Sequence, residues 1–345
     1  MSTKSQELEN YFMQNGDNYR SEKINSWKDL IHLQGCSSFK VHVWGSGGNF
    51  FFKEIAEYIS CVLQKEGFSL ETSKTWNSSI LDIVIAPHEF MYFDEGKEWS
   101  EERKSRSIYF NTEQWHTQWF ELSLKAIQFS KKVIDINPNS AKSFLSLGFD
   151  SAFAPIFLSP KCDNQLNDLK FIDIQLDNKF YPLQDRKIDL FFIACSNERR
   201  EKALADLSKH FSGLNTFIHC PNLKGRPILE NDPNSINLAQ ACAIARQSKV
   251  LLNIRRDNSL YFEWHRLFLM GINSGCVTIT EHSLHNDLIQ PSLNLNDTEA
   301  DYLECSVENM DKTIDRLFNT DEGLYQMQKI HENCIKTKER IINLY

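Results

Sequence analysis

Short apolar runs alternate with helical patterns along most of this chain, and this alternation constrains the fold more than any other feature. The clearest case is the segment from Ser248 to Glu281, SKVLLNIRRDNSLYFEWHRLFLMGINSGCVTITE. It predicts a buried strand over Val250–Ile254, an amphipathic helix, and a second buried strand over Cys276–Thr280. Strands separated by helices in this way pair in parallel, so the pattern favours an α/β fold.

Two arginines, Arg255 and Arg256, directly follow the first of these strands. In an open parallel sheet, ligands bind beyond the carboxyl ends of the strands. We expect both arginines to stand there, just before a helix N-terminus whose free N–H groups attract anions. A surface pair with Asp257 is the alternative. The segment therefore predicts a site for a diphosphate.

A second arginine pair follows an earlier apolar run. Ile188–Cys195 predicts a strand that leads into a helix, with Ser196 or Asn197 as the N-cap. Arg199 and Arg200 then lie in the first turn, where cations oppose the helix dipole. A bound phosphate would reverse that balance, because guanidinium pairs with it bidentately. Pairing with the neighbouring glutamates, or exposure to solvent, is the alternative.

Three more polar residues, Glu263, His265 and Arg266, lie early in the helix that follows Arg255. In a nucleotide site, Glu263 would accept hydrogen bonds from both ribose hydroxyls. Arg266 would add positive charge near a phosphate, with His265 beside it. For Glu263, the alternative is an ordinary anion near a helix N-terminus, worth about 0.3–1 kcal/mol.

The first half of the chain carries polar groups at two strand ends. His88 and Glu89 follow one buried run, and Glu113 follows the next. A histidine or carboxylate with a pKa near neutral can serve as a general base, so all three are candidates to take a proton from a hydroxyl group of a substrate. A structural or exposed histidine is the alternative for His88. Trp115 and Trp119, which flank Glu113, are predicted core residues, with stacking on a sugar ring as the alternative.

A glycine loop, Gly45–Asn49, separates a predicted strand from a predicted helix. Gly47, Gly48 and Asn49 leave room for a ligand or acceptor to approach the backbone. The loop lacks the third glycine of the dinucleotide fingerprint and the lysine of a Walker loop. A plain tight turn is therefore the alternative, and a dinucleotide-dependent oxidoreductase is the least favoured enzyme class.

Composition narrows the function classes. The 345 residues suffice for two domains. A net charge of -8 argues against a general nucleic-acid binder. Nine cysteines without a C-x-x-C pair argue against a zinc ribbon or disulfide framework and fit a reducing cytoplasm. No D-x-D stands at a predicted strand end, so neither a metal-bridged diphosphate nor any other cofactor is expected.

Membrane insertion is not predicted. The polar N-terminus carries no secretory signal pattern, and no apolar run approaches the about 18–20 residues of a membrane span. These patterns leave peripheral membrane contact open.

Proline and polar residues break the alternation between 153 and 186. We therefore place the connection between two α/β domains there. The predicted parts are a polar leader over 1–38, a first domain over 39–160, a connection over 161–187, a second domain over 188–323, and a last helix over 324–345.

The order of these motifs resembles that of bacterial GT-B glycosyltransferases, including the spore-coat-maturation (CgeB-like) group. IDLFFIACSNERR, VLLNIRRDNSLYFEWHRL and GINSGCVTITE resemble their carboxyl half, whereas IYFNTEQWHTQWF and KVIDINPNS resemble their amino half. The resemblance implies two Rossmann-like domains with parallel sheets facing across a cleft. A nucleotide-sugar donor would bind the second domain. A glycan, lipid-linked or protein acceptor would bind the first, onto which the last helix commonly crosses back. A role in polysaccharide biosynthesis is implied.

The resemblance also implies roles for single residues. Those near the donor diphosphate would be Ser196, Asn197, Arg199 and Arg200, and those near phosphate and ribose would be Arg255, Glu263, His265 and Arg266. Many retaining members carry E-x7-E, whose second glutamate falls at Met270 here. We therefore expect an inverting, base-assisted and metal-independent transfer. The alternative is a non-catalytic glycosyltransferase-like partner protein that binds nucleotide or glycan.

Overall fold

The computed structural model of the chain describes residues 28–29, 31, 36–154, 176–177, 179–223, 229, 232, 235–261, 263, 265–283 and 302–342. The chain divides into two compact units, which are Met1–Pro155 with Pro227–Asp232 and Ile156–Arg226 with Pro233–Tyr345. Most of the predicted leader (1–38) and of the predicted connection (161–187) lies outside the described residues. The predicted domain limits therefore stay predictions.

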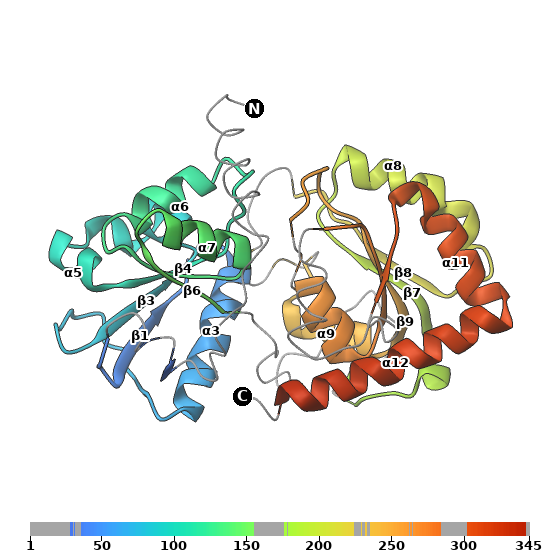
Figure 1. The fold of residues 1–345 in the computed structure, drawn as a ribbon, viewed down its shortest axis with the longest axis horizontal. Helices are drawn as coiled ribbons and strands as arrows, with labels where there is room; N and C mark the ends of the chain where they lie inside the picture. The colour runs from blue at the N-terminus through green and yellow to red at the C-terminus, as the bar shows by residue number, and fades with distance from the viewer. Residues whose placement is uncertain are drawn as a thin grey trace. The chain divides into compact units, whose positions relative to one another are not determined.

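The first unit is built on six parallel strands in the order β2-β1-β3-β4-β5-β6 (Figure 1). The strands are β1 (Lys40–Trp44), β2 (Ser69–Leu70), β3 (Leu81–Ile85), β4 (Ile108–Asn111), β5 (Lys132–Asp135) and β6 (Asp150–Phe153). Every residue of β3 and β4 is buried. Such continuous burial is typical of strands that are covered on both faces.

Helices cover both faces of this sheet. They are α3 (Phe50–Lys65), α4 (Pro87–Phe93), η1 (Glu95–Glu98), α5 (Glu101–Arg106), α6 (Phe120–Ile127) and α7 (Pro138–Ser146). Figure 1 shows α3 on one face of the sheet and α6 and α7 on the other. Local sequence sets the starts of two of them, because the Asn49 and Asn137 side chains accept hydrogen bonds from the first turns of α3 and α7.

The second unit has five parallel strands in the order β11-β10-β9-β7-β8. The strands are β7 (Ile188–Ile193), β8 (Thr216–His219), β9 (Ser248–Asn253), β10 (Val277–Thr280) and β11 (Tyr302–Glu304). The helical segments are η2 (Leu183–Asp185), α8 (Glu198–Leu207), η3 (Ser208–Phe211), α9 (Leu238–Arg246), η4 (His265–Gly271), η5 (Ile272–Ser274), η7 (Val307–Asn309), α11 (Met310–Asn319) and α12 (Asp321–Ile342).

Both sheets share one doubly wound topology. Numbered along the chain within each unit, the strand orders are 2-1-3-4-5-6 and 2-1-3-4-5. The winding direction therefore reverses between β1 and β3 in the first sheet and between β7 and β9 in the second. The predicted α/β class with two Rossmann-like parallel sheets is confirmed, whereas their arrangement across a cleft stays a prediction. Ligands bind such sheets at the carboxyl ends of the strands where the direction reverses.

The segment after β9 differs from its prediction. The predicted amphipathic α-helix is a π-helix, η4, that begins only at His265. Residues 254–261 form an irregular loop before it. We expected Arg255 and Arg256 to stand directly before a helix N-terminus, but in the structure they do not. The prediction was wrong here because hydrogen bonds of the loop itself, such as Ser259 N–H to Asp257 Oδ1 at 2.8 Å, hold a turn instead.

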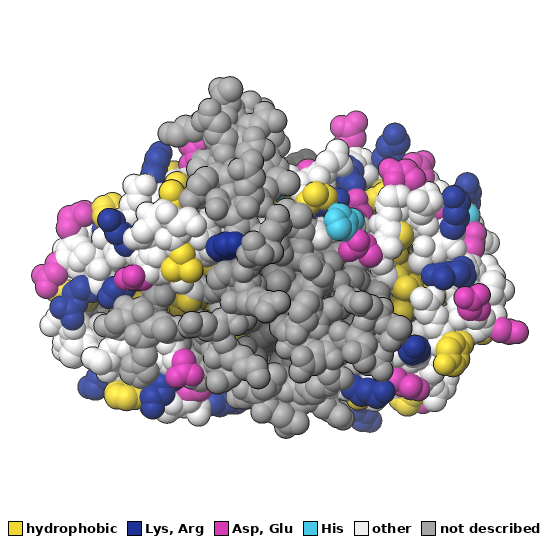
Figure 2. All heavy atoms as spheres, viewed as in Figure 1, with side chains coloured by type: hydrophobic (Ala, Val, Ile, Leu, Met, Phe, Trp, Pro, Cys, Tyr) yellow, Lys and Arg dark blue, Asp and Glu magenta, His cyan; other side chains and the backbone are white. Residues whose placement is uncertain are grey.

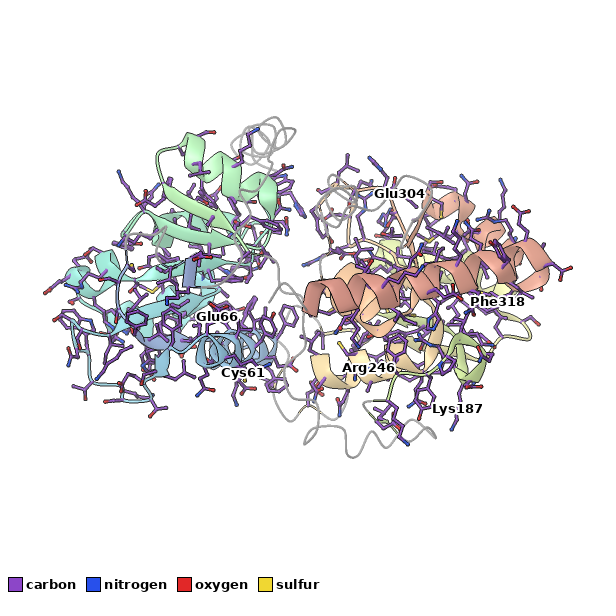
Figure 3. All side chains as sticks on the ribbon, turned by 60° about the horizontal axis from the view of Figure 1, so that its bottom comes forward. Cys61, Glu66, Lys187, Arg246, Glu304 and Phe318 are labelled. Carbon is purple, nitrogen blue, oxygen red and sulfur yellow. The ribbon has the colours of Figure 1, made fainter. Side chains whose placement is uncertain are left out.

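One buried arginine joins three strand starts at the amino edge of the second sheet. Arg186 lies just before β7 and donates to the backbone oxygen of Ser248, the first residue of β9, at 2.7 Å. It also donates to the backbone oxygen of Ser274, shortly before β10, at 2.8 Å. Lys187 and Arg246 mark this edge in Figure 3, and Glu304 marks the opposite, carboxyl edge. Arg186 thus satisfies carbonyls that the parallel ladder leaves without partners.

The last helix, α12, packs against η5 and β10 of the second unit. His331 on this helix makes a hydrogen bond with the backbone oxygen of Gly275 at 2.7 Å. The predicted return of this helix onto the first unit stays a prediction. None of the helices in the described ranges has the length and apolar content needed to cross a membrane. Acidic and basic side chains are interspersed over the face drawn in Figure 2.

Candidate functional site

The reversal point of the second sheet collects most of the predicted donor-site residues. Asn197 caps α8, because its Oδ1 accepts from the Arg200 backbone N–H at 2.9 Å. Its Nδ2 donates to the backbone oxygen of Arg256 at 2.7 Å, so the cap also ties the loop after β7 to the loop after β9. Ser196, the other predicted cap, instead donates its hydroxyl to Glu201. The structure thus decides between the two caps.

Arg200 is buried at this point and bridges the two strand ends. Its Nε donates to the oxygen of Ile254 at 2.9 Å, and its Nη1 donates to that of Cys195 at 3.1 Å. Its Nη2 lies 3.6 Å from Glu263 Oε1. Burial, and then repulsion by Arg266, lower the pKa of Arg200 to about 10. The Arg200 guanidinium therefore donates to two backbone carbonyls and also lies near the Glu263 carboxylate.

Arg199 pairs with Glu281, a residue that the sequence analysis did not single out. Two guanidinium nitrogens of Arg199 contact the two carboxylate oxygens of Glu281, with Nη1 2.9 Å from Oε2. The Arg255 backbone N–H donates to the same Oε2 at 2.7 Å. Glu281 follows β10 and is buried. It therefore connects the ends of β9 and β10 to the start of α8.

Glu263 and Arg266 form a second buried ion pair. Their side chains are in direct contact, and Arg266 Nε also donates to the oxygen of Ile193 at the end of β7 at 3.2 Å. Burial alone would raise the pKa of Glu263, but the charges of Arg266 and Arg200 outweigh it and hold that pKa below its usual value. Burial, and then the charge of Arg266, lower the pKa of His265 to about 3. His265 is therefore neutral near pH 7.

Six side chains form what we call the switch-point cluster: Arg199, Arg200, Arg255, Glu263, Arg266 and Glu281. Within these six side chains, four are cations and two are anions, which leaves an excess of two positive charges (four minus two). Asp257 and Glu308 add weaker negative charge at Arg199, at the rim of the cluster. Five of the six are buried, and Arg199 is partly buried. Buried charge without a counter-charge is costly, so the cluster favours an anionic ligand. Arg256, its predicted companion, is exposed.

Two buried polar atoms of the cluster have no hydrogen-bond partner among the residues that the structure describes. One is the donor Nε of Arg255 and the other is the acceptor Oε2 of Glu263. Buried polar groups of folded proteins are nearly always paired. A ligand with an anionic group and a hydroxyl group would satisfy both atoms.

The reversal point of the first sheet brings together the glycine loop and the start of α4. Asn49 Nδ2 donates to Glu89 Oε1 at 3.0 Å, and the Gly47 backbone N–H donates to Asp94 Oδ2 at 2.7 Å. Gly48 is exposed on the same loop. The predicted acceptor-side loop and the predicted base Glu89 thus lie side by side, as expected for strand ends that flank a reversal point.

The other two predicted bases, His88 and Glu113, meet directly. His88 Nε2 lies 3.4 Å from Glu113 Oε1, and Thr117 Oγ1 donates to Glu113 Oε2 at 2.8 Å. His88 is buried, and burial lowers its pKa to about 3. Its Nδ1 has no hydrogen-bond partner within the described part of the chain. Ala86, two residues earlier, has the left-handed φ of 53°, and such strain in a non-glycine residue clusters at functional sites.

Sequence reasoning missed a buried acid next to this site. Asp135 ends β5 and accepts hydrogen bonds from Asn111 Nδ2 and the Asn137 backbone N–H, both at 2.7 Å. Burial raises its pKa to about 8. The one available signal was an aspartate at the end of the apolar run VID. Of the two flanking tryptophans, Trp115 is a core residue as expected, whereas Trp119 is exposed.

Within the described ranges, no group of three or more His, Cys, Asp or Glu side chains is placed to hold a metal ion.

Solved structures with some likeness to this chain include three glycosyltransferases. SsfS6 of Streptomyces sp. SF2575, complexed with thymidine diphosphate, matches with a TM-score of 0.36 and 11% identity over 89% of this chain and 99% of its own. SnogD of Streptomyces nogalater matches with a TM-score of 0.36 and 8% identity over 90% of this chain and 100% of its own. The spinosyn rhamnosyltransferase SpnG, complexed with spinosyn aglycone, matches with a TM-score of 0.38 and 8% identity over 88% of this chain and 96% of its own. All three TM-scores lie below 0.5, so the fold described above rests on the strand order and register of the chain itself. No protein-family model and no curated protein sequence matches the chain.

Proposed function

We propose that this chain is a glycosyltransferase that moves a sugar from a nucleotide-diphosphate sugar to an acceptor hydroxyl. The observation that carries the proposal is the excess of two positive charges in the switch-point cluster. A sugar-linked diphosphate brings about two negative charges, so it would neutralise that excess. The order of sequence motifs that resembles GT-B glycosyltransferases supports sugar transfer as the chemistry.

The two unsatisfied atoms of the cluster suggest how the donor would lie. Arg255 Nε would donate to a phosphate oxygen, and Glu263 Oε2 would accept from a ribose hydroxyl. Arg199 and Arg200 would stabilise the departing diphosphate electrostatically. Because guanidinium groups would supply the counter-charge, we propose that no metal ion or other cofactor takes part. Ser196, Asn197, His265 and Arg266 would support these contacts.

The transfer step would use the polar groups of the first unit. A base would take the proton of the acceptor hydroxyl while its oxygen attacks the anomeric carbon. The bond from that carbon to the diphosphate oxygen would break, and the nucleoside diphosphate would leave with the electron pair. His88 is the first candidate, because its neutral ring has an unpartnered Nδ1 and Glu113 lies beside Nε2 to stabilise the imidazolium. Glu113 and Glu89 are the others.

We propose an inverting outcome. Met270, which occupies the place of the second glutamate in the retaining motif, is a buried apolar side chain. It offers no carboxylate to the donor. A single displacement assisted by a base on the acceptor side needs none there.

One observation favours a second candidate, a non-catalytic protein that binds nucleotide or glycan as a partner subunit. A general base works best with a pKa near the working pH, whereas burial lowers the pKa of His88 to about 3. If His88, Glu89 and Glu113 serve only the fold, donor binding would survive without transfer. The two candidates therefore share the switch-point cluster and differ in the first unit.

Calorimetric titration of the full chain with nucleoside diphosphates, monophosphates and NAD(P) in the presence of EDTA tests the donor site. We expect one diphosphate to bind. Arg255→Lys should weaken it about tenfold, because the lysine keeps the charge but loses one charge-assisted hydrogen bond. Arg316→Ala, which removes an exposed arginine of α11, is the control and should bind like the wild type. Binding of NAD(P) alone, or of no diphosphate, would overturn the proposal.

Hydrolysis of the matching nucleotide-sugar and its transfer to acceptor hydroxyls distinguish the two candidates. Turnover that is lost in both His88→Gln and Glu113→Gln, with unchanged diphosphate binding, supports the enzyme. Binding without any turnover supports the partner protein. The anomeric configuration of the product, read by NMR, tests inversion.

A further inference from the structure

Two large aromatic side chains of the first unit touch each other and are nevertheless exposed. Phe93, the last residue of α4, is 64% exposed, and Trp119, just before α6, is 39% exposed. Their ring centroids lie 6.3 Å apart at an interplanar angle of 80°. We call this pair the aromatic platform. Aromatic rings carry large amounts of apolar surface, so an exposed pair in contact is a candidate binding surface when other features point to a ligand there.

The platform adjoins the candidate base. The Trp119 ring centroid lies 6.3 Å from that of the His88 imidazole, and His88 Nε2 is 3.4 Å from Glu113 Oε1. The two helices that carry the platform, α4 and α6, contact each other. The same α4 that presents Phe93 at its end carries His88 and Glu89 in its first turn. A molecule seated on the platform would therefore lie next to the group that is proposed to take its proton.

The helix that carries Phe93 also carries or precedes hydrogen-bonding groups. Glu89 on α4 is half-buried and bonds Asn49 at 3.0 Å, and Asp94, which follows Phe93, accepts from the Gly47 N–H at 2.7 Å. Glu113 supplies a further carboxylate. The surface therefore combines a small aromatic area with carboxylate and amide groups, rather than forming a continuous apolar trough.

We propose that the aromatic platform binds a sugar ring of the acceptor, so that the acceptor is a glycan. This inference rests on the proposed function and names its acceptor class. A pyranose ring has an apolar C–H face and a rim of hydroxyl groups, which matches an aromatic face bordered by carboxylates and amides. An acyl chain would gain nothing from those polar groups and would leave them without water. One hydroxyl of the stacked ring would point towards His88 and Glu113.

Binding of the full chain to a panel of immobilised oligosaccharides and of lipid vesicles tests this inference directly. We expect the wild type to bind oligosaccharides, and Trp119→Ala and Phe93→Ala to bind them about tenfold more weakly. Trp119→Phe should retain most of the binding, because it keeps a ring. Trp119→Leu should not, because a leucine keeps apolar area without a flat face. Phe129→Ala is the matched control, since Phe129 is 41% exposed on the same unit.

The nucleotide titration separates failure of this inference from failure of the proposed function. All platform variants should bind the nucleoside diphosphate as the wild type does, because the platform belongs to the first unit and the switch-point cluster belongs to the second. If the diphosphate binds but no oligosaccharide does, or if Trp119→Ala binds oligosaccharides like the wild type, the acceptor inference is overturned and the donor site stands. Binding to vesicles that Trp119→Leu preserves would also overturn it, in favour of a lipid acceptor. If no diphosphate binds, the proposed function itself fails.

Discussion

Arg200 donates its Nε hydrogen to the backbone oxygen of Ile254 at 2.9 Å, and so joins the helix after β7 to the end of β9. These strands flank the reversal point of the second sheet, where the parallel ladder ends and carbonyl groups lose their partners. The same side chain reaches Cys195 at 3.1 Å. It therefore holds the site together and supplies part of its positive charge.

Replacing Arg200 by methionine should destabilise the protein. The change removes a donor from the buried carbonyl of Ile254 and from the carbonyl of Cys195, and it removes a cation next to Glu263. We expect a loss of about 2–4 kcal/mol in the free energy of unfolding. Urea unfolding followed by tryptophan fluorescence measures it. Lys202→Ala, an exposed change on the same helix, should cost less than about 0.5 kcal/mol. Equal stabilities of the two variants would contradict the bridging role.

Replacing Gly275, at the amino edge of the second sheet, by alanine should lower the free energy of unfolding more than the same change at Gly148. Its φ is 63°, and an added Cβ would collide with the Phe180 ring and lie 3.0 Å from Arg186 Nη2. Gly148 has a φ of 83° but open space around it, so Gly148→Ala adds backbone strain alone, about 1–2 kcal/mol. We expect Gly275→Ala to cost at least about 1 kcal/mol more than that. Thermal unfolding of both variants makes the comparison, and equal losses would refute it.

Asp135 should make the protein less stable as the pH rises. Its folded pKa is raised to about 8, above an unfolded value of about 3.9. The folded state therefore holds a proton that the unfolded state releases in this window. Stability from this group is complete below about pH 4 and is lost as the pH rises through about 8.

The Asp135→Asn variant isolates that contribution. Its side chain cannot titrate, so the variant does not lose this contribution as the pH rises. The free energy of unfolding of the variant minus that of the wild type should therefore increase steadily from pH 5 to pH 8. Urea unfolding at several pH values gives the difference. Asp150→Asn, which changes an exposed aspartate on the neighbouring strand β6, should show no such trend. A pH-independent difference for Asp135→Asn would show that the acid is ionised in the folded state.

Local sequence patterns predicted most strands and helix starts. The strands predicted over Ile188–Cys195, Val250–Ile254 and Cys276–Thr280 are β7, β9 and β10 of the structure, and the cap of α8 was one of two candidates. Local hydrogen bonds decided where the prediction was wrong. Trp119 was predicted to be a core residue but is exposed just before α6. That helix begins only at Phe120, because turns such as Thr117 N–H to Gln114 O at 3.0 Å occupy the preceding residues. The short helices α4 and α5 carry too few residues to show a period.

The candidate site could be predicted only in part. Residues directly after long apolar runs, such as Arg200 and His88, were found because parallel strands place their carboxyl ends at one edge. Glu281 was missed because its partner Arg199 lies 82 residues away. No periodicity or motif connects residues at that separation, and they meet only because β7 pairs with β9 and β9 pairs with β10. The exposure of Trp119 was missed for a related reason, since no local pattern shows that the residues before α6 form turns.

His88 allows two separate tests of catalysis, because its proposed role predicts a loss of transfer rate and its low pKa predicts the pH dependence. If its neutral ring takes the acceptor proton, His88→Gln should lower the rate of transfer at least about 100-fold and leave diphosphate binding unchanged. Burial lowers the pKa of His88 to about 3, so the ring stays neutral as the pH falls from 8 to 5. Titration of His88 should therefore add no inflection near pH 6.5 to the pH profile of kcat/KM. Any inflection that the wild type shows there should remain in His88→Gln. His210→Gln, in the second unit, is the control and should retain the wild-type rate. An inflection near 6.5 that belongs to His88 would mean that the ring is open to water when it reacts, and a full rate in His88→Gln would assign the proton to Glu113 or Glu89.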